Sequence, residues 1–429
     1  MFLNGSLFFC CMGRVVITGL GPLTPIGIGK EEFWDSLSHG RSDFRELPEY
    51  DVPGLNAHLG GDVWDFDEQF DFPSDVKRNN DRFSLYALAG AHLALEDAGI
   101  HPESLTDDER WRYACILGIG VGGIETFQNV AWDYQERLRA GGPRPSSLVR
   151  LVTKLMPNRA ASEIMTKLNL HGVSESINTA CASSNSSVIT AAQKIQANQA
   201  DVVITGGAEY SNTVLCQHSF DRAKAALSAT GSFPFDLNRD GFIMSSGAGI
   251  LILEDEAHAR ARGAHIYGEL VGYGETSDGY HVTAPHPEGV HAIEAFRQAF
   301  RMADVSPYRL DYVNAHGTGT KLNDAMETKV LKAVFGEYAL PISDPHLRVS
   351  STKSMTGHMT GAAGGVEIIA TLLAMQHGFI PPTINLKTPD PECDLDYTPN
   401  VGVSYDIKLA ASASYGFGGH NAVVLLKKR

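Results

Sequence analysis

The stretch SINTACASSNSS, residues 176–187, places one cysteine between a run that predicts a buried strand and a run that predicts the start of a helix. The residues after Cys181 form a polar first turn and then continue as an apolar helix to about residue 198. The N-terminus of a helix lowers the pKa of a nearby thiol, which makes the thiol a nucleophile. Most free cysteines are small buried hydrophobes, so this structural interpretation stays open beside catalysis.

On both sides of this stretch, apolar strands alternate with amphipathic helices. Strands are predicted at 13–21, 113–123, 201–209 and 247–255, and helices at 30–40, 81–99, 146–169 (interrupted at Pro157) and 183–198. Uniformly apolar strands are typical of a sheet covered on both faces. The pattern starts again after residue 264, with helices at 289–304, 323–335 and 361–377. We therefore predict an α/β fold with a duplicated core, divided into halves 13–264 and 265–429.

Size and composition fit this prediction. A single core seldom exceeds roughly 250 to 300 residues, and the chain has 429, of which 43% are apolar. The net charge of −15 disfavours nucleic acids and anionic membranes as partners. The cysteines show no CxxC pair, as expected of reduced thiols in a cytosolic protein without a disulfide framework or a zinc site. They are Cys10, Cys11, Cys115, Cys181, Cys216 and Cys393.

Residues 1–12 are apolar but lack a basic region and are too short to span a bilayer. We expect them to form a disordered or loosely packed extension, because Met12 directly precedes the first strand. No other stretch approaches the roughly 18 uncharged apolar residues that a membrane span needs.

Two histidines strengthen the catalytic interpretation of Cys181. His316 lies in NAHGTGT and His358 in KSMTGHMTGAAGG, each at a strand end among small residues. A lone histidine is more often structural. Open α/β sheets, however, place their sites at strand ends, and small neighbours let a substrate approach the imidazole. The three residues together favour Cys–His chemistry.

The motifs NTACASS, NAHGTGT, SSTKSMTGH, GAAGGVE, PPTINL and YGFGGHN occur in this order. With them the chain, from about residue 14 to 428, resembles the β-ketoacyl-acyl-carrier-protein synthases of the elongating class. This class includes synthase II and the ketosynthase subunits of type II polyketide systems. The resemblance implies a thiolase-like fold of five layers, α-β-α-β-α. It also implies a homodimer whose interface involves the strand near DVVITGG, with a heterodimer with a chain-length partner as the alternative.

The resemblance implies that Cys181 takes an acyl group from its carrier protein as a thioester. His316 and His358 then assist decarboxylation of malonyl-carrier protein in fatty acid elongation, giving a β-ketoacyl product and CO2. Two neutral imidazoles that donate N–H bonds stabilise the enolate oxygen, each by about 3 kcal/mol, so that no metal is required. No cofactor is implied beyond the phosphopantetheine arm that acyl carrier protein brings.

Further site residues follow from the resemblance, each with a structural alternative. Lys353 and Glu367 match a charged pair near the second histidine, which either tunes His358 or is a structural salt bridge. Asp324 and Glu327 are interpreted similarly, as residues at the start of a helix that belong to the polar network around the site. The expected substrate-binding residues are Thr318, Thr320, Phe417, Gly418, Val121 and Phe220.

The resemblance implies a role for most of these residues. Thr318 and Thr320 contact the pantetheine arm or the malonyl group, or are exposed turn residues. Phe417 is a mobile gate of the acyl pocket, and its backbone N–H, with that of Cys181, binds the acyl oxygen. Glycines flanking Phe417 let the backbone bend inward. Val121 controls pocket depth. The carrier-docking cations are Lys77, Arg78, Arg144, Arg222 and Lys224, with solvated surface charge as the alternative.

Departures from the family pattern keep a polyketide ketosynthase as the alternative function. CASSNSS replaces the usual CTSG, GTGT replaces GTST, and Tyr415 and His420 stand where Phe and Thr are frequent. A degradative thiolase is disfavoured because residues 412–421 contain no cysteine. His358 disfavours an initiating synthase, and Cys181 disfavours a non-catalytic chain-length partner. A thioester hydrolase or a carrier-binding scaffold remains as a rival of another class.

Overall fold

Two sets of strands with the same internal order form the centre of the molecule. The computed structural model describes residues 13–47, 54–55, 57–222, 227–340 and 347–429. The first set has the order β6-β5-β7-β8-β1 and the second the order β11-β10-β14-β15-β9. In each set the first two pairings are parallel and the last two antiparallel. The sets meet where residues 15–17 of β1 pair with residues 268–270 of β9.

The strands and helices have the following bounds. The strands of the first set are β1 (Val15–Thr24), β5 (Tyr113–Gly118), β6 (Ser174–Ile177), β7 (Val202–Glu209) and β8 (Gly247–Asp255). Those of the second are β9 (Gly268–Ser277), β10 (Tyr312–Asn314), β11 (Arg348–Ser350), β14 (Leu409–Gly416) and β15 (His420–Lys427). The longer helices are α1 (Gly29–Ser38), α4 (Arg82–Asp97), α6 (Ile124–Arg139), α7 (Leu148–Leu155), α8 (Arg159–Leu168), α9 (Ser183–Gln196), α10 (Val214–Arg222), α12 (Val290–Ala303), α13 (Lys321–Phe335) and α15 (Ala363–His377).

Two equivalent helices, α9 and α15, lie between the two sets of strands. Each follows a 3-10 turn, Ala180–Ala182 before α9 and Thr360–Ala362 before α15. Each turn starts at a non-glycine residue with positive φ, 53° at Ala180 and 45° at Thr360. Every residue of α15 from Ala363 to Met375 is buried, which is typical of a helix in the middle of a core. This repeated turn and helix show that the core is duplicated.

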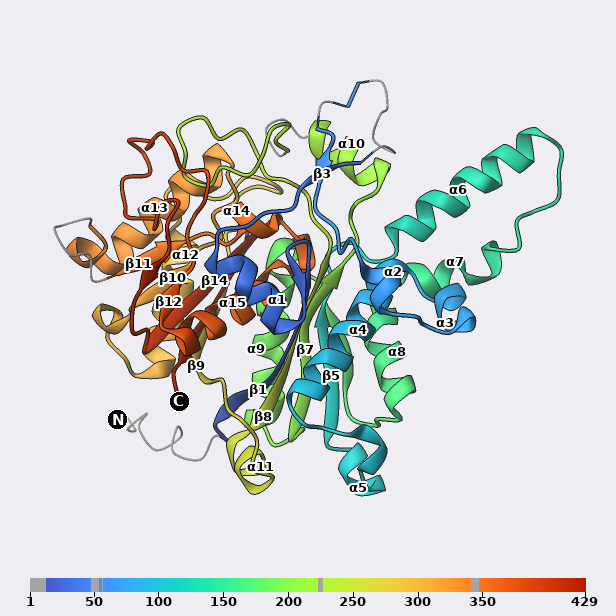
Figure 1. Cartoon of the computed structure of the whole chain (residues 1–429), viewed down its shortest axis with the longest axis horizontal. Coiled ribbons are helices and arrows are strands. Elements are labelled where there is room, and N and C mark those ends of the chain that lie inside the picture. Colours follow the sequence, from blue (N-terminus) through green and yellow to red (C-terminus); the bar gives the residue numbers. More distant parts are fainter. Residues whose placement is uncertain (1–12, 48–53, 56, 223–226, 341–346) are drawn as a thin grey trace.

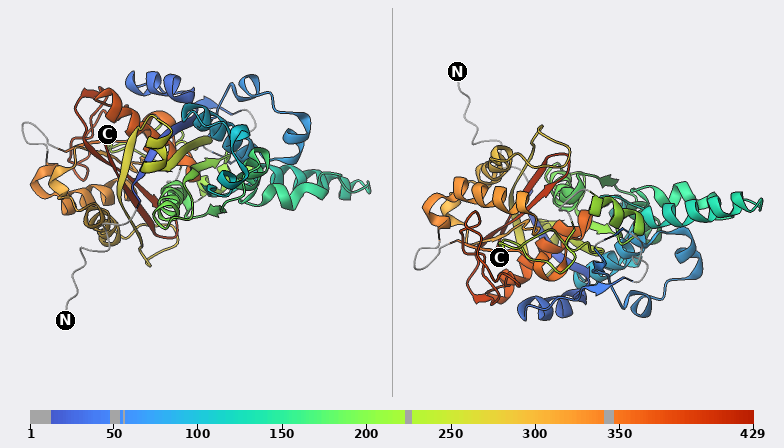
Figure 2. Two further views of the ribbon diagram at one scale, coloured as in Figure 1. Left: turned by 90° about the horizontal axis from the view of Figure 1, so that it is seen from below. Right: turned by 90° about the horizontal axis from the view of Figure 1, so that it is seen from above.

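Three apolar clusters lie between the helices and the two sets of strands, whose layered arrangement can be followed in Figures 1 and 2. The central cluster joins α9 and α15 to the facing sides of both strand sets. A second packs α4 and α8 on the outer face of the first set, and a third packs α12 and α13 on the outer face of the second. The predicted α-β-α-β-α arrangement is confirmed, and so is the break at Pro157, which separates α7 from α8.

The strand expected at a dimer interface is misassigned. β7 pairs with β5 on one side and β8 on the other, and all its residues are buried, so it has no free edge for a second chain. Among the described strands, β6 ends the first set and pairs only with β5. Its four residues are exposed or half-buried, so the open edge lies there.

Helices α6 and α7 form a hairpin that projects from the body of the molecule in each view (Figures 1 and 2). It carries exposed apolar side chains, namely Phe127, Trp132, Leu138, Val149 and Val152. Within the described part of the chain, no helix is both long and apolar enough to cross a membrane. Residues 1–12, for which we predicted a loose extension, lie outside the described residues.

Candidate active site

One cavity of about 200 Å³ brings together the three residues that the sequence singled out. Cys181 comes from the turn before α9 in the first half, whereas His316 follows β10 and His358 follows β11 in the second half. Phe220 and Phe417 also line the cavity. The reacting groups thus meet at a site assembled from both halves.

Hydrogen bonds fix the turn that carries Cys181. The Ser183 hydroxyl donates to the carbonyl of Ala180 (2.6 Å) and accepts from the N–H of Thr179 (3.0 Å). The Asn178 side chain accepts from the N–H of Ala180 (3.2 Å). These contacts hold Ala180 in its left-handed conformation, which an L-residue adopts at a cost, and so set the direction of the Cys181 side chain.

Burial raises the pKa of the Cys181 thiol to about 11, against the lowering effects of Lys353 and of the N–H groups of Phe417 and Cys181. The backbone N–H of Cys181 at the helix start lowers this pKa, as expected of a helix N-terminus, but the loss of hydration in the cavity wall outweighs the effect and the net shift is upward. The resting thiol is protonated, and the proton must leave when the substrate arrives.

The strand end at Gly416 lies directly against the nucleophile turn. A Cβ atom at Gly416 would sit 2.4 Å from the carbonyl oxygen of Thr179 and 3.2 Å from the nitrogen of Cys181, so this approach requires glycine. The next residue, Phe417, is 37% exposed, and its ring centroid lies 6.1 Å from that of Phe220. The N–H of Phe417 acts on the same sulfur as that of Cys181.

Lys353 contacts the first histidine directly, and its charge also acts on the second, as the predicted tuning of His358 requires. Its ammonium lies 3.3 Å from Nδ1 of His316 and forms an ion pair with Glu367, with both side chains at most 2% exposed. An ammonium has no lone pair, so Nδ1 accepts and the proton of His316 is on Nε2. Burial, then Lys353 and His358, holds the pKa of His316 well below 6.5. The ring is therefore a neutral donor.

A carboxylate holds the backbone of His316. Glu327 accepts from the N–H of His316 (2.8 Å) and from that of Gly317 (2.7 Å). Its neighbour Asp324 accepts from Gly319 (3.2 Å) and Phe235 (2.8 Å). The expected network residues are thus in contact with the histidine loop. Burial raises the pKa of Glu327 to about 7.

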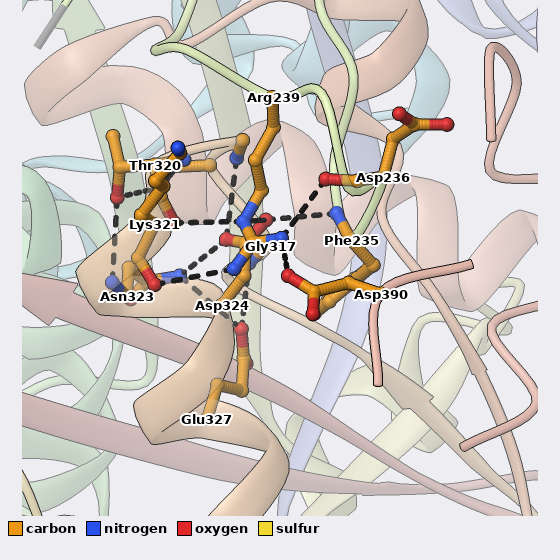
Figure 3. A network of polar contacts seen from close by, with 12 residues as sticks. Phe235, Asp236, Arg239, Gly317, Thr320, Lys321, Asn323, Asp324, Glu327 and Asp390 are labelled. Carbon is orange, nitrogen blue, oxygen red and sulfur yellow. Dashed lines mark hydrogen bonds and ion pairs between the residues drawn. The ribbon is translucent and has the colours of Figure 1, made fainter. Parts of the chain in front are cut away.

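The sequence did not identify Arg239, which completes this network. Figure 3 shows its side chain reaching between Asp324 and Asp390. It forms a buried ion pair with Asp390 and lies 3.5 Å from Asp324. Nothing in its local sequence marks it, since both of its carboxylate partners come from positions more than 80 residues away.

His358 packs against His316 and an aromatic wall. Its ring centroid lies 5.4 Å from that of His316 and 4.9 Å from that of Phe242, a residue that the sequence did not identify. The backbone N–H of His358 donates to the carbonyl of Ile243 (2.8 Å). Burial, then Lys353, holds the pKa of His358 well below 6.5, so this imidazole is neutral too. Its Nδ1 is buried without a hydrogen-bond partner among the described residues.

Thr318 and Thr320 both line the cavity, with their hydroxyls 3.0 Å apart. Thr318 is only 4% exposed, contrary to the idea of an exposed turn residue. Thr320 is the N-cap of α13 and accepts from the N–H of Asn323. Thr320 therefore both caps helix α13 and lines the cavity.

Of the other expected substrate-binding residues, two line the cavity and two do not. Phe220 and Phe417 line the cavity, but Val121 and Gly418 are absent from its described lining. Val121 instead donates its N–H to Glu209 (3.0 Å), and Gly418 donates to the carbonyl of Val282 (2.6 Å).

The expected docking cations come from separate elements. Lys77 and Arg78 lie on α3 (Ser74–Asn79), Arg144 lies between α6 and α7, and Arg222 ends α10. All four are exposed, and Arg222 is two residues beyond Phe220 of the cavity wall. Lys77 pairs with Asp71 (3.2 Å), whereas Lys224 lies outside the described residues.

The other cysteines take no part in this cavity. Cys115, Cys216 and Cys393 are unpaired and buried, and Cys10 and Cys11 lie outside the described residues. In the described part of the chain, no group of three or more His, Cys, Asp or Glu residues is placed to hold a metal ion.

Comparison with known proteins agrees with this geometry. Residues 12–259 match the family model "Beta-ketoacyl synthase, N-terminal domain", and residues 267–387 match "Beta-ketoacyl synthase, C-terminal domain". The 3-oxoacyl-[acyl-carrier-protein] synthase 2 of Staphylococcus aureus (strain N315) is 40% identical over 419 residues, covering 97% of this chain and 98% of the relative.

Solved structures agree as well. The ishigamide ketosynthase/chain length factor has a TM-score of 0.86 at 34% identity and covers 97% of this chain and 100% of its own. The AntDE:AntF structure, a type II PKS acyl-carrier protein in complex with its ketosynthase, has a TM-score of 0.88 at 30% identity with the same coverage. These matches confirm the thiolase-like fold and the resemblance on which the site was predicted. The chain therefore belongs to the β-ketoacyl synthase family and is a condensing acyltransferase.

Proposed function

We propose that this enzyme joins an acyl group held on Cys181 to a two-carbon unit from malonyl-acyl-carrier protein. The sulfur of Cys181 attacks the acyl thioester, and the carrier thiol leaves. The malonyl group then loses CO2, and the resulting carbanion attacks the Cys181 thioester. A carbon–carbon bond forms, the thiol is released, and β-ketoacyl-carrier protein departs. The observation that carries this proposal is that Cys181, His316 and His358 line one cavity.

The two imidazoles are suited to the decarboxylation step. Decarboxylation places negative charge on the malonyl thioester oxygen, and neutral N–H donors aimed at that oxygen stabilise it. Lys353 keeps the proton of His316 on Nε2, so that this atom is always a donor. His358, whose Nδ1 is unpartnered, can present either tautomer and can also receive the proton that Cys181 loses.

Fatty acid elongation is the pathway that the relatives favour, because those with about 40% identity are named 3-oxoacyl-[acyl-carrier-protein] synthase 2. A ketosynthase subunit of a type II polyketide system is the second candidate. A solved type II PKS ketosynthase shares the fold, and Tyr415 and His420 depart from the fatty acid pattern.

An acyl carrier protein is the proposed donor of both substrates, since a structurally similar ketosynthase was solved in complex with one. Its phosphopantetheine arm enters past Phe220 and Phe417, while Arg222 and the other exposed cations attract the acidic carrier. The arm is the one prosthetic group that the reaction needs.

Mass spectrometry of the protein and products tests this function. The enzyme is incubated with acyl-carrier proteins of several chain lengths, with and without malonyl-carrier protein. We expect the protein to gain the mass of the acyl group, and malonyl-carrier protein to yield CO2 and a product two carbons longer. A hydrolase gives free acid without malonyl groups, and a scaffold gives neither product. Repeated extension without reduction indicates the polyketide alternative.

We also propose that the enzyme is a dimer formed through the β6 edge and the α6–α7 hairpin. The open edge of β6 and the exposed apolar residues of the hairpin support it, as does the ketosynthase/chain length factor pair among the solved structures. Two identical chains are expected. A heterodimer with a chain-length partner is the alternative, in which the protein alone is monomeric.

Light scattering checks the dimer. The wild type is expected at twice the mass of one chain. The double change Trp132→Glu and Val149→Glu is expected to reduce the measured mass to that of one chain, because the new carboxylates would be buried in the interface. Trp111→Glu, at an exposed tryptophan outside the hairpin, is the matched control and leaves the mass unchanged. A wild-type mass of one chain contradicts the homodimer.

Two further predictions from the sequence stand as proposals. The boundary between the halves near residues 264 and 265 is supported by the strand order and by the two family models. Location in the cytoplasm rests on the cysteine pattern and on the acidic composition.

A further inference from the structure

A buried carboxylate that the sequence did not identify lies between the two turns of the site. Glu209, at the end of β7, is fully buried and accepts from the N–H groups of Gly120 (2.7 Å), Val121 (3.0 Å) and Gly122 (3.1 Å). The N–H of Gly361 also bonds to it. All the partners described for this carboxylate are therefore backbone amides and not a cation. Such a buried charge is retained only if its hydrogen bonds are complete.

The position of Glu209 follows from the duplication of the core. Gly361 is the middle residue of the turn before α15, as Cys181 is of the turn before α9. A Cβ atom at Gly361 would lie 2.7 Å from Oε2 of Glu209 and 2.4 Å from the nitrogen of Gly120. At the turn before α15, the Glu209 carboxylate thus takes the place that corresponds to the Cys181 side chain at the turn before α9.

Hydrogen bonds connect this carboxylate to both reacting groups. Gly361 is three residues after His358, and its carbonyl accepts from the hydroxyl of Ser184, which is three residues after Cys181 (2.6 Å). The carbonyl of Gly120 accepts from Asn178 (2.7 Å), and Asn178 in turn binds Ala180. The loop 120–122 therefore touches the cysteine turn through Asn178 and the histidine turn through Glu209.

We propose that Glu209 is a positioning residue that keeps the turn of His358 in register with the turn of Cys181. This inference rests on the roles proposed above for these two residues. Glu209 makes no direct hydrogen bond to the Cys181 turn or to the N–H of Phe417, and its charge raises the pKa of the Cys181 thiol, so loss of that charge does not hinder loading. Condensation needs both turns at once. Burial raises the pKa of Glu209 to about 7 against the lowering effect of the four amides, so the charged form depends on these contacts.

The substitution Glu209→Gln tests the proposal, because it keeps the shape but turns an acceptor into an NH2 group that faces N–H donors. Loading is followed by protein mass and condensation by product formation, both per titratable Cys181. We expect kcat for condensation to fall about 5- to 100-fold, while loading is not slowed and KM for malonyl-carrier protein stays within about twofold of wild type. Glu209→Asp keeps the charge and is expected to lie between wild type and Glu209→Gln.

The matched control is Glu163→Gln, at another buried carboxylate of the first half that pairs with Arg159 on α8. It is expected to leave the ratio of condensation to loading unchanged. An equal loss of both steps in Glu209→Gln, wild-type condensation in that variant, or no advantage of Glu209→Asp overturns the proposal. Should Glu209→Gln not fold, Glu209→Asp carries the same comparison of loading with condensation. A wild-type enzyme that never loads Cys181 instead contradicts the proposed function.

Discussion

Cys181→Ala is expected to abolish loading of the acyl group. Among the described residues, Cys181 is the only one that brings a sulfur to the cavity wall, so it is the thiol expected to form the thioester there. The substitution removes one atom beside small residues and leaves the hydrogen bonds of Thr179, Ala180 and Ser183 intact. Protein mass spectrometry after incubation with acyl-carrier protein is expected to show no added acyl group.

The same variant separates the two half-reactions. His316, His358 and Lys353 are unchanged, so release of CO2 from malonyl-carrier protein is expected to continue in Cys181→Ala. Cys216→Ala, at a buried thiol on α10 outside the cavity lining, is the matched control and is expected to load normally. Acyl transfer to the Cys181→Ala protein would show that another residue is the nucleophile.

The pH dependence of loading follows from the raised pKa of this thiol. Below a pKa of about 11, the thiolate fraction rises about tenfold with each pH unit. Alkylation of Cys181 by iodoacetamide is therefore expected to accelerate steadily from pH 7 to pH 9, without a plateau. A plateau in this range would mean that the thiol is already ionised in the resting enzyme.

His316→Ala and His358→Ala are expected to impair loading less than condensation, and to lower condensation about 100- to 1000-fold each, the usual cost of removing one donor to a developing oxyanion. Both rings are neutral, because burial lowers the pKa of each well below 6.5, so each has an N–H to give at neutral pH. Initial rates of CO2 release and of product formation measure the loss.

The two substitutions are expected to be less than additive, because the rings lie 5.4 Å apart and act on one oxygen. His39→Ala, at an exposed histidine after α1, is the control and retains full activity. Equal loss of loading and condensation in either variant would contradict the assigned roles, since it would place the histidine in the chemistry of Cys181 alone.

Sequence patterns predicted those parts of the fold that depend on local periodicity. The apolar strands and the helices with polar ends, including the one after Cys181, were predicted within a few residues, and the restart after residue 264 indicated the duplication. The strand near DVVITGG, which the family resemblance placed at a dimer interface, is the interior strand β7, because neighbours in a sheet are set by long-range pairing and not by local pattern.

The site was predicted where the motif itself carries the chemistry, as at Cys181, His316 and His358. Contacts between distant segments were not. The direct contact of Lys353 with His316 was not predicted, because the two lie 37 residues apart and only the fold brings that ring to the ammonium. Arg239 and Glu209 bind groups 80 or more residues away, and the direction of the Cys181 pKa shift depends on burial, which a short motif does not contain.

The sulfur is encoded before α9 and the imidazoles in the second half, so each partner of the new carbon–carbon bond is handled by a different part of the gene. A change near Cys181 or α10 that alters which acyl chain is accepted leaves the apparatus that generates the carbanion untouched. Selection on chain length and selection on decarboxylation therefore act on separate stretches of sequence, which lets one family diversify its products while keeping a single chemistry.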